Sequence, residues 1–145
     1  VMKALNKQRI NLSALSTGPA IRMLDDAIAF AKQRRQFDKA IGEFQLIQAM
    51  LAECKVEIEA ARALILETAR KRDRDEDVTL EVSLCKYYST EMCGRVADKV
   101  VQVFGGEGYV KGTGIARFYR DVRAFRIYEG TSQIHLLNIA KNLLK

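Results

Sequence analysis

Helix-breaking residues are scarce in this chain. Its 145 residues include one proline, Pro19, and nine glycines that are partly clustered. Proline removes a backbone donor and glycine raises the entropic cost of ordering, so long stretches without either favour helices. No stretch shows the strict alternation of apolar and polar residues that a sheet needs. The sequence therefore predicts an all-α fold.

Long apolar runs are absent as well. No run of 18 or more apolar residues occurs, so the sequence predicts no membrane span. Residues 1–15 lack the charged segment followed by an apolar segment that marks a secretory signal. The chain begins without an initiator methionine, and we expect it to be cut from a longer polypeptide.

The chain is also poor in metal-binding and disulfide-forming patterns. Its three cysteines include Cys85 and Cys93, eight residues apart on one predicted helix, which places them about 12 Å apart along the axis. That separation is too great for a disulfide. No Cys-x-x-Cys occurs, and His135 is the single histidine, so a zinc site has too few ligands. We interpret the cysteines as small apolar packing residues in a reducing compartment.

The composition is that of one globular domain over residues 1–145. Hydrophobic residues make up 48% of the chain and charged residues 29%, with a net charge of +6, and this length buries a real core. The positive charge has three interpretations: a solvated surface, a nucleic-acid surface, or arginines that meet phosphates of a cofactor or thioester. The nucleic-acid interpretation is weak because acids are interspersed with the bases and no basic arm occurs. Charge alone does not choose between the other two.

Helical periodicity divides the chain into five segments. The pattern predicts helices at about 3–35, 44–72, 78–104, 115–123 and 131–144. Gly18-Pro19 predicts a kink or short break in the first, and residues 36–43 read as a connector. The charge run 71–77 predicts a turn, with Asp77 or Thr79 as the next N-cap.

These helices predict an antiparallel four-helix-type bundle with short connections. The third helix carries a line of small residues that permits close approach of a neighbouring helix. Those residues are Cys85, Ser89, Cys93 and Ala97. On the last helix we expect Ile134, Leu137 and Leu144 to form the apolar side. We expect His135 to be a surface or interface histidine rather than a catalytic one.

Three segments between helices combine unusual residues. Residues 34–37 read Arg-Arg-Gln-Phe and precede Phe44-Gln45; residues 102–109 read Gln-Val-Phe-Gly-Gly-Glu-Gly-Tyr; residues 128–134 read Tyr-Glu-Gly-Thr-Ser-Gln-Ile. Taken alone, the first is explained by cations at a helix C-terminus and the second by a glycine cap. The third places a carboxylate before a helix start that Thr131 or Ser132 can cap. It is either a capping carboxylate or a base at a preorganised helix end.

Together, in this order and spacing, the three segments resemble the C-terminal third of acyl-CoA dehydrogenases. The resemblance covers essentially all 145 residues and implies the C-terminal helical domain of that family. The family's N-terminal helical domain and middle β-domain are absent from the sequence. The resemblance implies an FAD-dependent enzyme that oxidises the Cα–Cβ bond of an acyl-CoA thioester to trans-2-enoyl-CoA.

The resemblance assigns Glu129 as the catalytic base that removes the α-proton while the β-hydrogen leaves as hydride to the flavin. It places Asn6, Arg9, Tyr128 and Gly130 at substrate-binding positions. One branch of the family carries its glutamate on the first helix, just before the residue that matches Arg9. Here that residue is Gln8, which cannot act as a base, so Glu129 is the one candidate.

The resemblance also implies the cofactor contacts. Arg34 matches an arginine that meets the FAD diphosphate, and further positions match contacts to FAD, in part across a subunit interface. The implied FAD-binding residues are Arg34, Gln36, Phe37, Gln45, Gln102, Val103, Phe104, Gly105, Gly106, Thr131, Ser132 and Gln133. Asp38 stands where the family often has glycine, and Gly18-Pro19 falls where its first helix usually runs through.

For the whole protein, the resemblance implies acyl-CoA as substrate, electron-transfer flavoprotein as electron acceptor, and a homodimer or homotetramer. It implies the cytoplasm of a bacterium or the mitochondrial matrix of a eukaryote. We expect the isolated fragment to be inactive. Two alternatives stay open: a non-catalytic helical association module derived from the same family, and an oxidase that passes electrons to oxygen.

Overall fold

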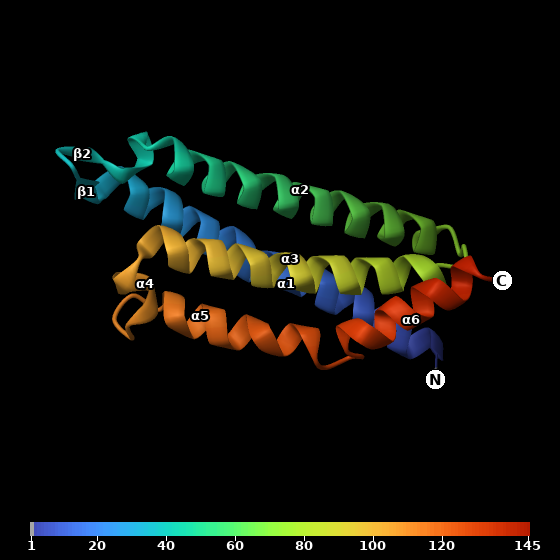
Figure 1. Ribbon diagram of the computed structural model, residues 1–145. Helices are drawn as coiled ribbons and strands as arrows, with labels where there is room; N and C mark the ends of the chain where they lie inside the picture. The colour runs from blue at the N-terminus through green and yellow to red at the C-terminus, as the bar shows by residue number, and fades with distance from the viewer. Residues whose placement is uncertain (1) are drawn as a thin grey trace.

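Three long antiparallel helices form the frame of the protein. The computed structural model describes residues 2–145, with side chains described from residue 8 onward. Helix α1 spans Met2–Gln33, α2 spans Gln45–Asp73 and α3 spans Thr79–Phe104. Each reverses the direction of the one before it, and all three pack against one another (Figure 1). The predicted all-α antiparallel bundle is confirmed.

Shorter elements lie at the two ends and along one side of this frame (Figure 1). They are the hairpin strands β1 (Arg35–Gln36) and β2 (Lys39–Ala40), the 3-10 helices η1 (Ile41–Glu43) and η2 (Arg123–Arg126), and helices α4 (Gly106–Tyr109), α5 (Ile115–Val122) and α6 (Ser132–Leu143). The hairpin and α4 lie at one end of the bundle, and α6 packs on α3 at the other (Figure 1).

Helix α1 is continuous through Gly18-Pro19, where the sequence predicted an interruption. Pro19 lies inside α1, which runs from Met2 to Gln33, so of the predicted kink or short break at Gly18-Pro19 the break is wrong. Proline deprives the carbonyl four residues earlier of its helical donor. That carbonyl belongs to Leu15, which is 58% exposed, so the donor is lost on the solvent side of the helix, where its cost is small.

The core lies where α3 packs against α1, α2, α5 and α6. The predicted line of small residues on α3 is fully buried: Cys85, Ser89, Cys93 and Ala97 each have 0% exposure. The three cysteines are free and buried, and burial raises the pKa of Cys54 to about 11 and that of Cys93 to about 12. Thiols held in this neutral form are packing residues.

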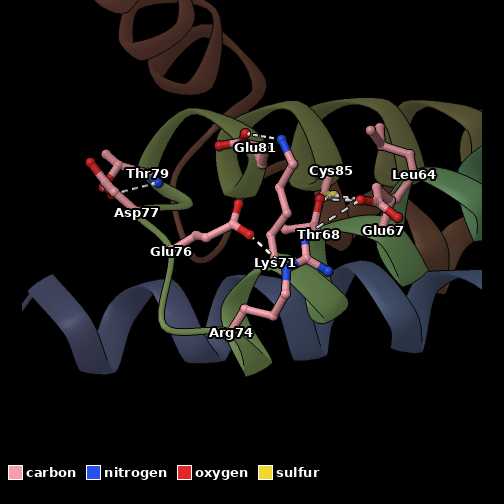
Figure 2. A network of polar contacts seen from close by, with 10 residues as sticks. All are labelled: Leu64, Glu67, Thr68, Lys71, Arg74, Glu76, Asp77, Thr79, Glu81 and Cys85. Carbon is pink, nitrogen blue, oxygen red and sulfur yellow. Dashed lines mark hydrogen bonds and ion pairs between the residues drawn. The ribbon is translucent and has the colours of Figure 1, made fainter.

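A polar network fixes the connection between α2 and α3. Lys71 Nζ lies 2.7 Å from Glu81 Oε1, and Thr68 Oγ1 lies 3.0 Å from Cys85 Sγ (Figure 2). The carboxylate of Asp77 accepts from the amide of Thr79 at 3.0 Å. The N-cap position itself falls on Val78, one residue from each predicted cap, although Asp77 does satisfy an amide of the first turn.

Helix α6 packs with its polar side inward. Its buried residues are Ser132 and His135, whereas Ile134, Leu137 and Leu144 are 47%, 66% and 87% exposed. The predicted apolar side therefore exists but faces away from the bundle. Among the described residues, no helix combines the length and apolar character needed to cross a membrane.

Candidate functional site

A groove of about 840 Å³ opens at the end of the bundle that carries the hairpin. The C-terminal end of α1, the hairpin, the start of α2 and the end of α3 enclose it. It brings together most of the residues that the first two sequence segments singled out. Those lining it are Arg34, Gln36, Phe37, Phe44, Gln45, Val103, Phe104, Gly105 and Gly106.

Aromatic rings form the base and one edge of this groove. Phe30 stacks on Phe104 with ring centroids 4.2 Å apart and planes 17° from parallel. Phe37 meets Phe44 edge to face at 6.1 Å, and its side chain is 87% exposed. An exposed ring over a stacked aromatic base suits a planar apolar ligand group.

The hairpin turn presents Phe37 to the groove. Phe37 and Asp38 have φ values of 53° and 64°, and two consecutive residues with positive φ give the turn whose twist matches a two-residue hairpin. Aspartate tolerates this region better than most residues because its short side chain is polar. This explains how Asp38 replaces a glycine, and a two-residue ladder explains why no strand signal was detectable in the sequence.

Positive charge and open backbone complete the groove. Arg34 Nη1 lies 3.0 Å from Glu107 Oε1, and both side chains are about half exposed at 46% and 47%. Lys39 Nζ lies 4.3 Å above the Phe44 ring. Gly105 has a φ of 59°, and a Cβ at Gly105 or Gly106 would meet nothing within 4 Å. Cations beside exposed backbone are features that recognise phosphate.

Glu129 lies elsewhere, on the turn between η2 and α6. Its φ is 56° and that of Gly130 is 95°. Glu129 faces a shallow cavity of about 290 Å³. The other residues that line it are Gln8, Asn11, Leu12, Leu15 and Tyr128. Glu129 therefore faces a surface that is partly apolar, and Gln8 lies within the same cavity.

Donors from two helices converge on the backbone carbonyl of Glu129. Arg9 Nε donates to it at 3.2 Å, and His135 Nε2 lies 3.2 Å from it. His135 has 0% exposure within this chain, so the prediction of a surface or interface histidine is wrong: its position one turn into α6 places the ring beneath the Glu129–Gly130 turn. Arg9, expected to bind substrate, contacts the turn itself. Asn6 lies outside the residues whose side chains are described.

A third cavity, of about 280 Å³, contains Thr131, Ser132 and Gln133. Thr131 caps α6, with its hydroxyl accepting from the amide of Ile134 at 3.3 Å. Ser132 Oγ donates to Glu91 Oε1 at 2.5 Å, and Arg126 Nε lies 3.3 Å from the other oxygen of Glu91. These three residues and the groove therefore lie at different places on the bundle, although the sequence assigned both to one cofactor.

Some site residues escaped the sequence interpretation. Lys39, which was not predicted, lines the groove. Gln102, which was predicted to bind FAD, is exposed but does not line it. Lys86 is fully buried, and its Nζ donates to the carbonyl of Gly130 at 2.5 Å. The position of Lys86, four residues after Val82 and three before Ser89, places it on the buried side of α3, but the sequence gives no sign of its partner, the Gly130 carbonyl.

Comparison with known proteins gives one consistent family. Residues 1–144 match the family described as acyl-CoA dehydrogenase, C-terminal domain. The caffeyl-CoA reductase-Etf complex subunit CarC of Acetobacterium woodii is 42% identical over 144 residues, 99% of this chain and 38% of that protein. The 3-(aryl)acrylate reductase of Clostridium sporogenes is also 42% identical, with 99% of this chain and 38% of that protein covered.

Comparison with solved structures points to the same family. The butyryl-CoA dehydrogenase of Megasphaera elsdenii superposes with a TM-score of 0.96 at 37% identity, over 99% of this chain and 38% of that chain. The chain thus spans well under half the length of the relatives it matches, namely 38% of each of these three.

Proposed function

The chain belongs to the acyl-CoA dehydrogenase family, and from that membership we propose that it works as the C-terminal domain of a longer FAD-dependent enzyme. In this proposal the enzyme oxidises the Cα–Cβ bond of an acyl-CoA thioester to trans-2-enoyl-CoA. The observation that carries it is the position of Glu129, on a turn held by donors from two helices and facing a cavity beside Leu12 and Leu15.

Glu129 is the group that takes the α-proton. A carboxylate is a weak base in water, and an apolar surrounding that excludes water strengthens it. Leu12 and Leu15 supply one apolar wall here, and the missing domains would cover the rest. The adjacent Gly130 has a φ of 95°, and a Cβ there would lie 3.0 Å from Nε2 of the buried His135. The turn that carries Glu129 therefore needs glycine at this position.

The groove at the hairpin end fits part of FAD. Arg34 and Lys39 offer charge to a diphosphate, the open backbone at Gly105 and Gly106 permits close approach, and the exposed ring of Phe37 suits a planar base. Bound FAD supplies the hydride acceptor. Arg34 is already paired with Glu107, so binding a phosphate there requires that exposed ion pair, whose contribution is small, to open.

Reduction of an α,β-unsaturated acyl-CoA, the reverse of the oxidation proposed above, is a second candidate function. Two relatives at 42% identity are named as a caffeyl-CoA reductase-Etf complex subunit and a 3-(aryl)acrylate reductase. In a reductase, Glu129 would deliver the proton to the α-carbon instead of removing it, since the same groups serve both directions. The first of these names also supports electron-transfer flavoprotein as the redox partner of the full-length protein. Assays with a saturated acyl-CoA and with its α,β-unsaturated counterpart distinguish the directions.

Replacement of the base tests this proposal. In the full-length enzyme, we expect Glu129→Gln to retain FAD and lose turnover by a factor on the order of 10² to 10⁴, as for loss of a general base. Steady-state turnover on a panel of acyl-CoA and enoyl-CoA thioesters, with the visible spectrum of bound flavin, measures both. Glu59→Gln is the matched control, because Glu59 is an exposed residue of α2.

The 145-residue chain alone should be inactive. Its groove offers contacts to one part of FAD, and nothing in the sequence supplies the family's middle β-domain. We therefore expect neither tight FAD binding nor acyl-CoA oxidation, and Glu129 would be open to water. Titration of the chain with FAD, followed by flavin fluorescence, checks this; a Kd below about 1 μM, roughly 8 kcal/mol of binding, would contradict it.

A further inference from the structure

The turn that carries Glu129 is conformationally unfavourable. Glu129 and Gly130 both have positive φ, 56° and 95°. For glutamate the left-handed region costs on the order of 1–2 kcal/mol, because Cβ approaches the following carbonyl oxygen. Such a conformation persists where its surroundings hold it in place.

Side chains from three helices donate to the two carbonyls of this turn, those of Glu129 and Gly130. Arg9 of α1 and His135 of α6 reach the carbonyl of Glu129, both at 3.2 Å. Since a carbonyl oxygen only accepts, His135 must carry its proton on Nε2. Nδ1 is buried and has no partner among the described residues, so the ring has one polar contact, and that contact is with the turn.

Lys86 of α3 holds the next carbonyl. Its Nζ donates to Gly130 O at 2.5 Å, and its side chain has 0% exposure. Burial lowers the pKa of Lys86 to about 8, while Glu91 and Glu129 favour its protonated form. Among the described side chains, no carboxylate is within ion-pair distance of this ammonium group, so a backbone carbonyl is its direct partner.

A buried lysine on a carbonyl is a costly way to fill this space. Removing an ammonium group from water costs several kcal/mol unless it is paired, and an apolar side chain of similar volume would avoid that cost. The carbonyl of Gly130 is also one residue from the carboxylate that the proposed function uses. Its fixation determines where the Glu129 side chain leaves the backbone.

We propose that Lys86 is a positioning residue for the Glu129 carboxylate, holding the Glu129–Gly130 turn through the carbonyl of Gly130. This inference rests on the proposed role of Glu129 as the base. Lys86 acts on the chain that carries the base and touches no reacting atom in this account. Its loss therefore changes the rate of proton abstraction more than the affinity for the thioester.

Substitution in the full-length holoenzyme tests this role. Lys86→Met keeps a long unbranched side chain without a donor, and Lys86→Gln keeps a neutral donor on a shorter side chain. We expect Lys86→Met to retain FAD, to lower kcat about 10- to 100-fold, and to change KM less than threefold, in the range of a misplaced catalytic group. Lys86→Gln should recover part of kcat.

Lys99→Met is the matched control on the same helix. Lys99 pairs with Glu53 and Glu57 on α2, away from the turn, and this substitution should leave kcat and KM unchanged. A Lys86→Met enzyme with kcat within twofold of the parent would overturn the proposal. Loss of FAD and of the folded state in both Lys86 variants would also overturn it, since Lys86 would then support the bundle and not the turn.

Glu129→Gln in the same series separates this inference from the proposed function. If Glu129→Gln stays active, the proposed base is wrong, whatever the Lys86 variants do. If Glu129→Gln is inactive and Lys86→Met is fully active, the assignment of Glu129 as the base is supported and the positioning role of Lys86 is wrong.

Discussion

At the scale of single residues, burial keeps His135, which donates to the Glu129 turn, in one protonation state. Burial lowers the pKa of His135 to about 4, so the ring is neutral near pH 7. A neutral ring with its proton on Nε2 donates to the carbonyl of Glu129. The same ring would be charged below pH 6.5 in an unfolded chain, so folding and protonation of His135 oppose each other.

This opposition predicts an acid-sensitive stability. The unfolded chain binds a proton at His135 below about pH 6.5 and the folded chain only below about pH 4. The folded state therefore loses stability as pH falls from 6.5 toward 4, by about 2 kcal/mol from this residue at pH 5. Urea unfolding of the 145-residue chain at pH 7 and pH 5 measures the loss.

His135→Gln is the control for this prediction, because its amide also donates a hydrogen bond but does not titrate. Its stability should change less between pH 7 and pH 5 than that of the parent. Equal losses in both proteins would show that other groups cause the acid sensitivity.

Single residues also mark how far sequence reasoning reached. Glu129 became a candidate base in the sequence because its neighbours form a specific pattern along the chain. Lys86 and His135 were not, since their roles depend on which backbone carbonyls the fold brings to them. Donor–acceptor pairs separated by 44 residues, as Lys86 and Gly130 are, leave no local signal.

At the scale of elements, helical periodicity was a reliable guide for the long helices. Helices α2 and α3 begin and end within one residue of their predicted limits, because apolar spacing and the charged turn both fix them. The hairpin and α4 were missed since two to four residues are too few for periodicity. The outward orientation of the apolar side of α6 was missed, because a sequence pattern shows that a helix has an apolar side without showing what covers it.

The close packing of α3 gives a prediction at this scale. Ala97 has 0% exposure in the line of small residues, so a larger side chain there must push a neighbouring helix away. We expect Ala97→Leu to destabilise the chain by about 1–3 kcal/mol. Ala63→Leu, on the exposed side of α2, should change stability by less than about 0.5 kcal/mol. Urea unfolding curves of the two variants compare them, and similar midpoints would contradict the packing described here.

At the scale of the whole molecule, apolar surface is left exposed on α6 and α2. On α6 it consists of Ile134, Leu136, Leu137, Leu143 and Leu144, and on α2 of Leu46, Val56 and Leu66. A cluster of exposed large apolar side chains on one short helix, as on α6, is typical of a binding face. An association module would use the same surface.

We predict that the isolated chain self-associates through this surface. Sedimentation velocity over a range of concentrations should show a dimer or larger species that Leu137→Lys weakens, because a charge at a buried contact carries a desolvation cost. A single monomeric species at all concentrations would contradict the prediction. Leu137 is 66% exposed in the free chain, so the substitution should not disturb its fold.

Exchange of the substrate α-hydrogen tests the central claim, that Glu129 is the base, most directly. The full-length enzyme with bound FAD is incubated anaerobically in deuterated water with an acyl-CoA, and deuterium at the α-carbon is measured by mass spectrometry. The account predicts that Glu129→Gln slows exchange by at least about 10²-fold, while Glu59→Gln exchanges at the parent rate. A Glu129→Gln enzyme that holds FAD and exchanges the α-hydrogen at the parent rate would contradict it.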